Sequence, residues 1–132
     1  MASRIQAINA YRPKIKLGRT AETSELVEFI ARSTGLNESG VRQVLLELRD
    51  TVIFFNKQGR SVKLEGLGTY APSIDLEGKI KISHRADQSL KNAINAQGAF
   101  QGKIENRENI GKTGNELVAM WNGQNPENVA SS

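Results

Sequence analysis

An apolar stripe from Val41 to Phe55 limits the folds that are open to this chain. Its members recur every three or four residues, as on one face of a helix of about four turns: Val41, Val44, Leu45, Leu48, Val52 and Phe55. Asn37 is predicted to cap the start of this helix. Ile53 and Phe54 lie off the stripe, so the helix needs apolar partners on two sides.

A shorter helix is predicted just before this one. Either Thr23 or Ser24 can cap its first turn, and Gly35 supplies the left-handed residue that ends it. The apolar face between them consists of Leu26, Val27, Phe29 and Ile30. The two segments therefore predict a helix–turn–helix pair.

Short strands are predicted after Gly59. Val62 and Leu64 alternate with polar residues, and Gly66-Leu67-Gly68 interrupts the alternation where the backbone turns tightly or approaches another group closely. Glu77-Gly78 predicts the turn of a hairpin whose apolar residues are Tyr70, Ile74, Ile80 and Ile82. Asp87 can cap a last short helix.

The two ends of the chain differ from the middle. Residues 4–19 predict two short strands or an extended arm, and residues 1–20 carry five basic side chains and no acidic one. From residue 96 the chain reads as a polar tail, in which Thr113 and Glu116 form a capping box for a short helix near 114–122. Trp121 on this helix could dock a partner or fold back on its own molecule.

Composition excludes several classes of function. The 132 residues suit one domain, contain no cysteine, and carry a net charge of +4. The sequence shows neither a Ser-His-Asp arrangement nor a supported carboxylate pair, and His84 stands alone, so we expect no enzyme, cofactor or metal site. No apolar stretch approaches the roughly 20 residues that span a membrane, and no signal peptide is recognised, so a cytoplasmic location is expected.

Two segments carry a resemblance to a known family. Residues 59–70 contain a glycine, a basic residue, an alternating strand and then Gly66-Leu67-Gly68-Thr69-Tyr70, and residues 83–91 lead into the last helix. This pattern resembles the bacterial histone-like HU/IHF family over residues 23–95. Leu67 replaces the usual first aromatic residue of the family signature.

Two departures mark the chain as a divergent, HU-like member. Only thirteen residues, 71–83, fill the place of the family's long DNA-embracing β-arms, so the arms look shortened. Pro72 lies too near the base of the hairpin to act as the family's intercalating wedge. The family's basic–Pro–Gly–basic junction appears here as Arg85-Ala86-Asp87-Gln88, with one basic residue and an added acid.

The resemblance implies an α+β fold: an intertwined homodimer with a helix–turn–helix, a three-stranded antiparallel sheet and a short C-terminal helix. The expected divisions are a basic N-terminal arm or strands at 1–22, a DNA-binding domain at 23–95 and a tail at 96–132. The implied function is binding of double-stranded DNA without sequence specificity, as a nucleoid-associated architectural protein. No membrane or small-molecule substrate is expected. The phosphate-contact candidates are Arg60, Lys63, Lys79, Lys81, Arg85 and Lys91.

Two alternatives stay open. The chain could be an interaction or assembly module on an HU scaffold that has lost most DNA binding, which the small charge surplus and Asp87 favour. A helix–turn–helix regulator that reads bases with residues 38–57 is disfavoured, because that helix carries a continuous apolar stripe and few polar readers. The basic N-terminal residues either track the DNA backbone or extend a sheet, and Ile5, Ile15 and Leu17 favour the sheet.

Overall fold

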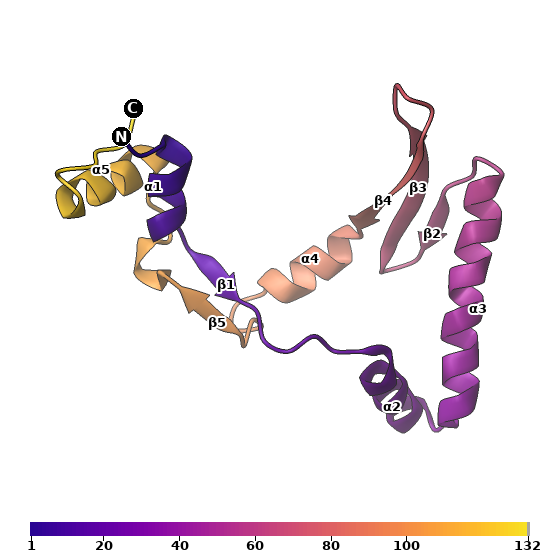
Figure 1. Ribbon diagram of the computed structural model, residues 1–132. Helices are drawn as coiled ribbons and strands as arrows, with labels where there is room; N and C mark the ends of the chain where they lie inside the picture. Colours follow the sequence, from indigo (N-terminus) through magenta and orange to yellow (C-terminus); the bar gives the residue numbers. More distant parts are fainter. Residues whose placement is uncertain (132) are drawn as a thin grey trace. The chain divides into compact units, whose positions relative to one another are not determined.

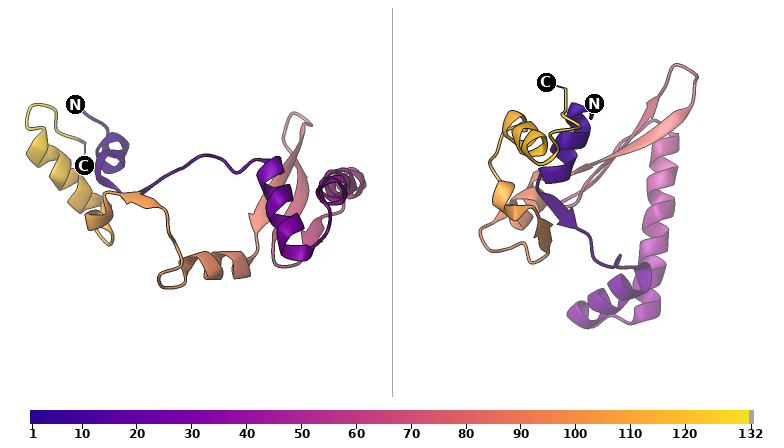
Figure 2. Two further views of the ribbon diagram at one scale, coloured as in Figure 1. Left: turned by 90° about the horizontal axis from the view of Figure 1, so that it is seen from below. Right: turned by 60° about the vertical axis from the view of Figure 1, so that its left-hand side comes forward.

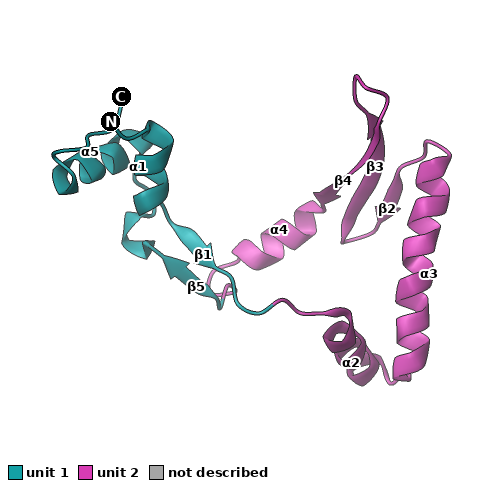
Figure 3. Cartoon of the chain, in the orientation of Figure 1, with its two compact units in different colours: residues 1–19, 101–132 teal, residues 20–100 magenta. Residues whose placement is uncertain are grey.

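The computed structural model describes residues 1–131, and the chain divides into two compact units (Figure 3). Unit 1 consists of Met1–Arg19 together with Gln101–Ser132, and unit 2 is Thr20–Phe100. Unit 2 is therefore inserted between the two halves of unit 1. Across residues 1–131, no helix combines the length and the apolar character that crossing a membrane requires.

Unit 2 begins with the two predicted helices, α2 (Thr23–Thr34) and α3 (Glu38–Lys57) (Figure 1). The Asn37 side chain accepts a hydrogen bond of 2.7 Å from the Gly40 N–H, which confirms the predicted cap of α3. Gly35 ends α2 in the left-handed conformation, with φ of 78°. The predicted cap of α2 is wrong by one residue, because Glu22 accepts the first backbone bond, from the Leu26 N–H, and Thr23 already lies in the helix.

A three-stranded antiparallel sheet follows in residues 62–86. Its strands β2 (Val62–Leu64), β3 (Gly68–Ile74) and β4 (Ile80–Ala86) pair in the order β2-β3-β4. Strand β2 covers only the start of β3, so the β3–β4 hairpin continues beyond it (Figure 2). The turn at Gly78, which has φ of 84°, confirms the predicted hairpin.

Helix α4 (Gln88–Asn95) is the last helix or strand of unit 2 along the chain. The Asp87 side chain accepts a hydrogen bond of 3.0 Å from the Ser89 N–H, as the sequence predicts. The order helix–turn–helix, three-stranded antiparallel sheet and short helix confirms the predicted α+β fold class.

Unit 1 combines both ends of the chain. Helix α1 (Arg4–Tyr11) and strand β1 (Lys14–Lys16) come from the N-terminal segment. The C-terminal segment contributes β5 (Lys103–Glu105), a 3-10 turn η1 (Arg107–Asn109) and α5 (Gly114–Gln124). Strands β1 and β5 pair in an antiparallel ladder.

The strand prediction for the start of the chain is wrong at α1. The Ser3 side chain accepts a hydrogen bond of 3.0 Å from the Gln6 N–H and so caps a helix. Ser and Gln at this spacing form the capping-box pattern, which outweighed the loose alternation of the segment. Strand β1 does fall within the stretch where strands were predicted, and β5 was not predicted at all.

The core of unit 1 lies between α1 and α5. Ala2, Ala7, Val118 and Ala130 are buried together, and Ile8 and Trp121 pack against them. The Trp121 Nε1–H donates a hydrogen bond of 2.8 Å to the Asn128 carbonyl. Trp121 therefore folds back on its own chain, which answers the question that the sequence left open.

The residues expected to be a separate arm and tail contact each other in unit 1. That residues 1–22, 23–95 and 96–132 fold as separate parts stays a prediction. The predicted short helix near 114–122 corresponds to α5, and the Thr113 hydroxyl accepts a hydrogen bond of 3.2 Å from the Glu116 N–H.

Candidate nucleic-acid interface

The sheet of unit 2 has two chemically different faces. Because side chains alternate along a strand and directly paired residues share a face, the register assigns each residue to one side. Val62, Tyr70 and His84 are aligned across the three strands on one face. Pro72, Ile74, Ile80 and Ile82 extend this apolar face along the hairpin.

The opposite face carries a basic row. Lys63 pairs with Thr69, and Thr69 pairs with Arg85, so the two basic residues flank a threonine across the three strands. Lys81 pairs with Ser73 and lies on the same face of β4 as Arg85. All three basic side chains are exposed. The structure thus brings together Lys63, Lys81 and Arg85 of the predicted contacts.

The other predicted contacts lie outside this row. Lys79 belongs to the hairpin turn, where its N–H donates a hydrogen bond of 2.9 Å to the Asp75 carboxylate. Arg60 precedes β2, and its guanidinium carbon lies 4.8 Å from the centroid of the Phe55 ring, a cation–π contact. Lys91 lies on α4.

Two acidic side chains reduce the positive charge of the basic row. The Lys81 Nζ lies 3.9 Å from an oxygen of Asp75. Asp87 follows Arg85 closely, and hydrogen bonds from the side chain and backbone of Ser89 lower its pKa, with a smaller contribution from the charge of Lys63. Asp87 therefore stays ionised at neutral pH beside the row, which opposes phosphate binding.

Asp75 is a residue that the sequence analysis missed. One of its carboxylate oxygens accepts hydrogen bonds of 2.9 Å from the N–H groups of both Glu77 and Lys79. An Asp that binds the backbone two residues ahead is a common turn signal, and Gly78 follows here. The sequence pattern Asp75-Leu76-Glu77-Gly78 could have identified this role.

Gly68 is the glycine whose lack of a side chain matters most to the sheet. A Cβ at this position would lie 2.5 Å from the Arg85 carbonyl oxygen and 2.6 Å from His84 Nε2. Its φ of 156° also disfavours other residues. The close approach expected at Gly66-Leu67-Gly68 is thus a contact between β3 and β4, next to Arg85.

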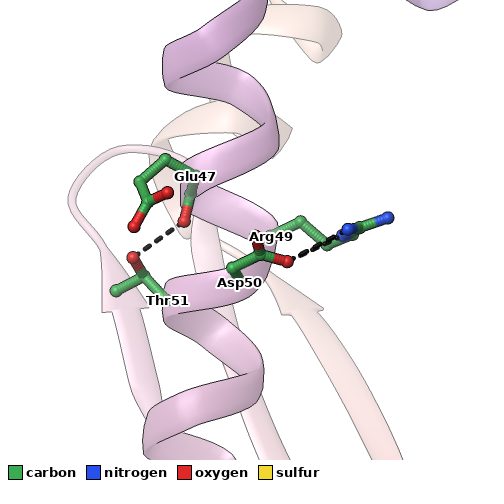
Figure 4. Close-up of polar contacts among 4 residues, drawn as sticks. All are labelled: Glu47, Arg49, Asp50 and Thr51. Atoms are coloured by element: carbon green, nitrogen blue, oxygen red, sulfur yellow. Dashed lines mark hydrogen bonds and ion pairs between the residues drawn. The ribbon is translucent and has the colours of Figure 1, made fainter.

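The apolar face of the sheet borders an open hollow of about 390 Å³. Helix α3 contributes Leu45, Leu48 and Val52 to its lining, and the sheet side contributes Leu64, Leu67 and Ile82. Arg49 also lines it, but its side chain is exposed and forms an ion pair of 3.0 Å with the adjacent Asp50 (Figure 4). The hollow is accordingly almost entirely apolar.

Few apolar side chains of unit 2 are buried. Val27 and Val41 are the buried hydrophobic residues between Thr20 and Phe100, all of which the structure describes. Several large side chains on the helices and sheet stay more than half exposed: Phe29, Leu36, Val44, Phe54, Ile74, Ile80, Ile82 and Ile94. A monomeric domain rarely exposes so much apolar surface, so unit 2 lacks part of its core.

The paired helices, the two-faced sheet and the closing helix together define an HU-like α+β domain. A family model described as "HU domain fused to wHTH, Ig, or Glycine-rich motif" (HU-HIG) matches residues 6–95, and the chain belongs to this family. Among solved structures, the chain is similar to an HU mutant from Thermotoga maritima, with 16% sequence identity and a TM-score of 0.49 over 55% of this chain and 97% of that chain. No curated protein matches the chain. The family match confirms the resemblance drawn from residues 59–70 and 83–91.

Proposed function

We propose that this protein is a nucleoid-associated architectural protein of the cytoplasm that binds and condenses double-stranded DNA without sequence specificity. The observation that carries the proposal is the two-faced sheet, with Lys63, Lys81 and Arg85 exposed on one side and apolar residues on the other. An exposed basic row of this kind suits contacts with backbone phosphates, which carry no sequence information. The proposal involves no catalysis, cofactor, membrane or small-molecule substrate.

The proposed binding form is a homodimer. The apolar hollow between α3 and the sheet, and the exposed apolar residues around it, need a complementary apolar surface. A second copy of the same unit provides one, because a two-fold interface pairs each patch with its own equivalent. Two sheets would then present their basic rows together, which gives a wider phosphate-binding surface than one chain offers.

The proposed mechanism is electrostatic. Lysine and arginine contacts release counterions from the duplex, so affinity falls steeply with salt. The hairpin is short, and we expect a shallow complex with a dissociation constant in the micromolar range or weaker, as in non-specific binding of roughly 10⁻⁴–10⁻⁶ M. A tight complex that prefers one sequence would contradict this mechanism.

Fluorescence polarisation of a labelled duplex at two salt concentrations tests the proposal directly. We expect binding at low salt that weakens steeply at high salt. The variant Lys63→Glu with Arg85→Glu should abolish most of it. The control Arg32→Glu with Arg42→Glu makes the same charge change on the helices and should bind better than the sheet variant. Equal loss in both variants would argue against the basic row.

A second candidate function is an interaction or assembly module on the HU scaffold. The observation in its favour is that unit 2 has ten basic and ten acidic residues and thus no net charge. The Lys81–Asp75 ion pair and the ionised Asp87 also weaken the basic row. Absence of duplex binding even at low salt, with the dimer intact, would favour this alternative.

A further inference from the structure

The positive charge of the protein is concentrated outside the HU-like domain. Unit 1 contains eight basic and four acidic residues, so it carries the entire net charge of +4. Unit 2 is neutral although it is the larger unit. Long-range attraction to a polyanion therefore acts mainly on unit 1.

Three lysines of unit 1 share one face of the β1–β5 ladder. The register pairs Lys14 with Glu105, Ile15 with Ile104, and Lys16 with Lys103. Because paired residues share a face and neighbours alternate, the two isoleucines lie on one side. The other side, which we name the lysine face, holds Lys14, Lys16, Lys103 and Glu105.

Lys16 and Lys103 place two like charges directly opposite each other, which is unusual in a protein without a bound ligand. Directly opposite residues in an antiparallel ladder have their Cβ atoms about 5 Å apart, and like charges at that spacing are destabilising. Both side chains are exposed, and neither forms an ion pair with any residue that the structure describes. An anion bound between the two ammonium groups would relieve the repulsion.

Hydrogen bonds hold the lysine face in place. The Asn106 side-chain N–H₂ group donates to the carbonyls of Ala10, at 3.3 Å, and Arg12, at 3.0 Å. The buried Asn109 donates a hydrogen bond of 2.6 Å to the Tyr11 carbonyl. These bonds join the end of β5 to the segment just before β1, so the lysines are presented on a fixed ladder rather than on a loose arm.

The lysine face differs from the basic row of the sheet in unit 2. There, Lys81 is paired with Asp75, and Asp87 adds an ionised carboxylate near Lys63. On the ladder, Glu105 is the acidic residue of the face; it lies directly opposite Lys14 and two residues along β5 from Lys103. Among the described residues it forms no ion pair with Lys16 or Lys103. No carboxylate in contact therefore neutralises these two lysines, and both ammonium groups are available to an external anion.

We propose that the lysine face of the β1–β5 ladder is a second phosphate-binding surface, in which Lys16 and Lys103 together bind a backbone phosphate of a nucleic-acid duplex. This inference rests on the proposed function for its ligand, and it adds a contact in unit 1 to the one proposed for unit 2. The chain then has two phosphate-binding surfaces, one on each unit.

The test uses the full chain and a labelled mixed-sequence DNA duplex. Lys16→Thr with Lys103→Thr removes two charges, and threonine favours strands, so the ladder is retained. We expect roughly tenfold weaker binding at low salt and a salt slope smaller by about 2. The matched control, Arg107→Thr with Lys112→Thr, removes the same charge from residues of unit 1 outside the ladder and should bind nearly as the parent.

Hydrogen exchange of residues 1–19 and 101–131 checks that unit 1 stays folded. If the double variant unfolds it, the single variants Lys16→Gln and Lys103→Gln should each weaken binding in the same direction. Lys16→Arg with Lys103→Arg keeps the charge and should bind as the parent. Loss of binding in that variant would contradict a phosphate contact.

The outcomes separate this inference from the proposed function. If the ladder variant binds as the parent while Lys63→Glu with Arg85→Glu does not bind, the lysine face is excluded and the sheet remains the interface. Equal losses in the ladder variant and its control show a general charge effect and also exclude the site. A parent chain that fails to bind duplex at low salt overturns both proposals. Binding to anionic phospholipid vesicles that added duplex does not displace also overturns both.

Discussion

The two units of this chain differ in how much of their apolar surface they bury. Unit 1 is the smaller, yet it buries Ala2, Ala7, Leu117, Val118 and Ala130 by bringing both ends of the chain together. Unit 2 is larger and has long helices, yet it buries only Val27 and Val41 among its apolar residues, over the fully described range 20–100. Unit 1 forms its core within one chain. Unit 2 instead leaves much of its apolar surface exposed, as expected of one side of an interface.

Charge divides between the units in the same direction. Unit 1 carries the net positive charge, and unit 2 is neutral. An apolar, neutral unit suits association with its own copy, because repulsion between copies is small. A charged unit with a closed core suits contact with a polyanion. Mutations should therefore be able to disrupt self-association and electrostatic attraction separately.

The largest expected effect comes from a charge in the apolar hollow of unit 2. Val52→Asp would place a carboxylate there, and burying it without a partner should cost about 3–5 kcal/mol per chain. We expect the proposed dimer to dissociate, with a solution mass that falls to that of one chain in light scattering. Gln43→Asp adds the same charge at an exposed position of α3 and should leave the mass unchanged. A parent protein that is folded and monomeric would refute the comparison itself.

The next effect should be confined to unit 1. Trp121→Ala removes the packing on the Ala7 and Val118 cluster and the hydrogen bond to Asn128, at a cost of about 3 kcal/mol. Hydrogen exchange should accelerate in residues 1–19 and 101–131, while unit 2 keeps its protection and the proposed dimer stays intact. Trp121→Phe retains most of the packing and should have a smaller effect. Loss of protection in both units would show that they fold as one.

A smaller effect is expected at Asn109, which is 1% exposed. Asn109→Ala loses the hydrogen bond to the Tyr11 carbonyl and leaves that acceptor without its partner, which should cost about 1–3 kcal/mol. Asn109→Asp keeps the shape but replaces the donor with a buried acceptor, so it should destabilise unit 1 more than alanine does. Chemical denaturation followed by Trp121 fluorescence measures both. The reverse order would mean that shape rather than donation holds the two chain ends together.

The smallest effect concerns the cap of α4 in unit 2. Hydrogen bonds from Ser89 lower the pKa of Asp87 from its ordinary value of 3.8. A lowered pKa in the folded state means that the carboxylate stabilises the fold fully above pH 3.8 and loses this effect as the pH falls through the lowered pKa. We expect faster hydrogen exchange in residues 88–95 over that acidic range, after correction for the intrinsic rate. Asp87→Asn keeps a capping oxygen and should remove the pH dependence.

Local signals in the sequence predicted a large part of unit 2. The caps at Asn37 and Asp87 and the left-handed Gly35 act through residues at most four positions away, so their effect can be read without the fold. The hairpin at Gly78 is equally local. The apolar stripe on α3, with Ile53 and Phe54 off it, also predicted that this helix needs apolar partners on two sides.

The candidate interface was predicted less completely. Lys63, Lys81 and Arg85 were named from the resemblance and from alternation, and the register places them on one face. The ion pair of Lys81 with Asp75 depends on how the turn folds back, which alternation alone does not specify. The sheet's basic row was thus foreseeable, and its partial neutralisation was not.

Local signals are enough to specify the helices, the turns and the two-faced strands, because each depends on neighbours within a few residues. The pairing of residues 14–16 with residues 103–105, and the bonds by which Asn106 and Asn109 join them to the C-terminal end of α1, depend instead on the tertiary structure. Such contacts require closing a loop of more than eighty residues, and three-residue strands have too few alternating positions to specify a partner. The lysine face exists only once that loop has closed.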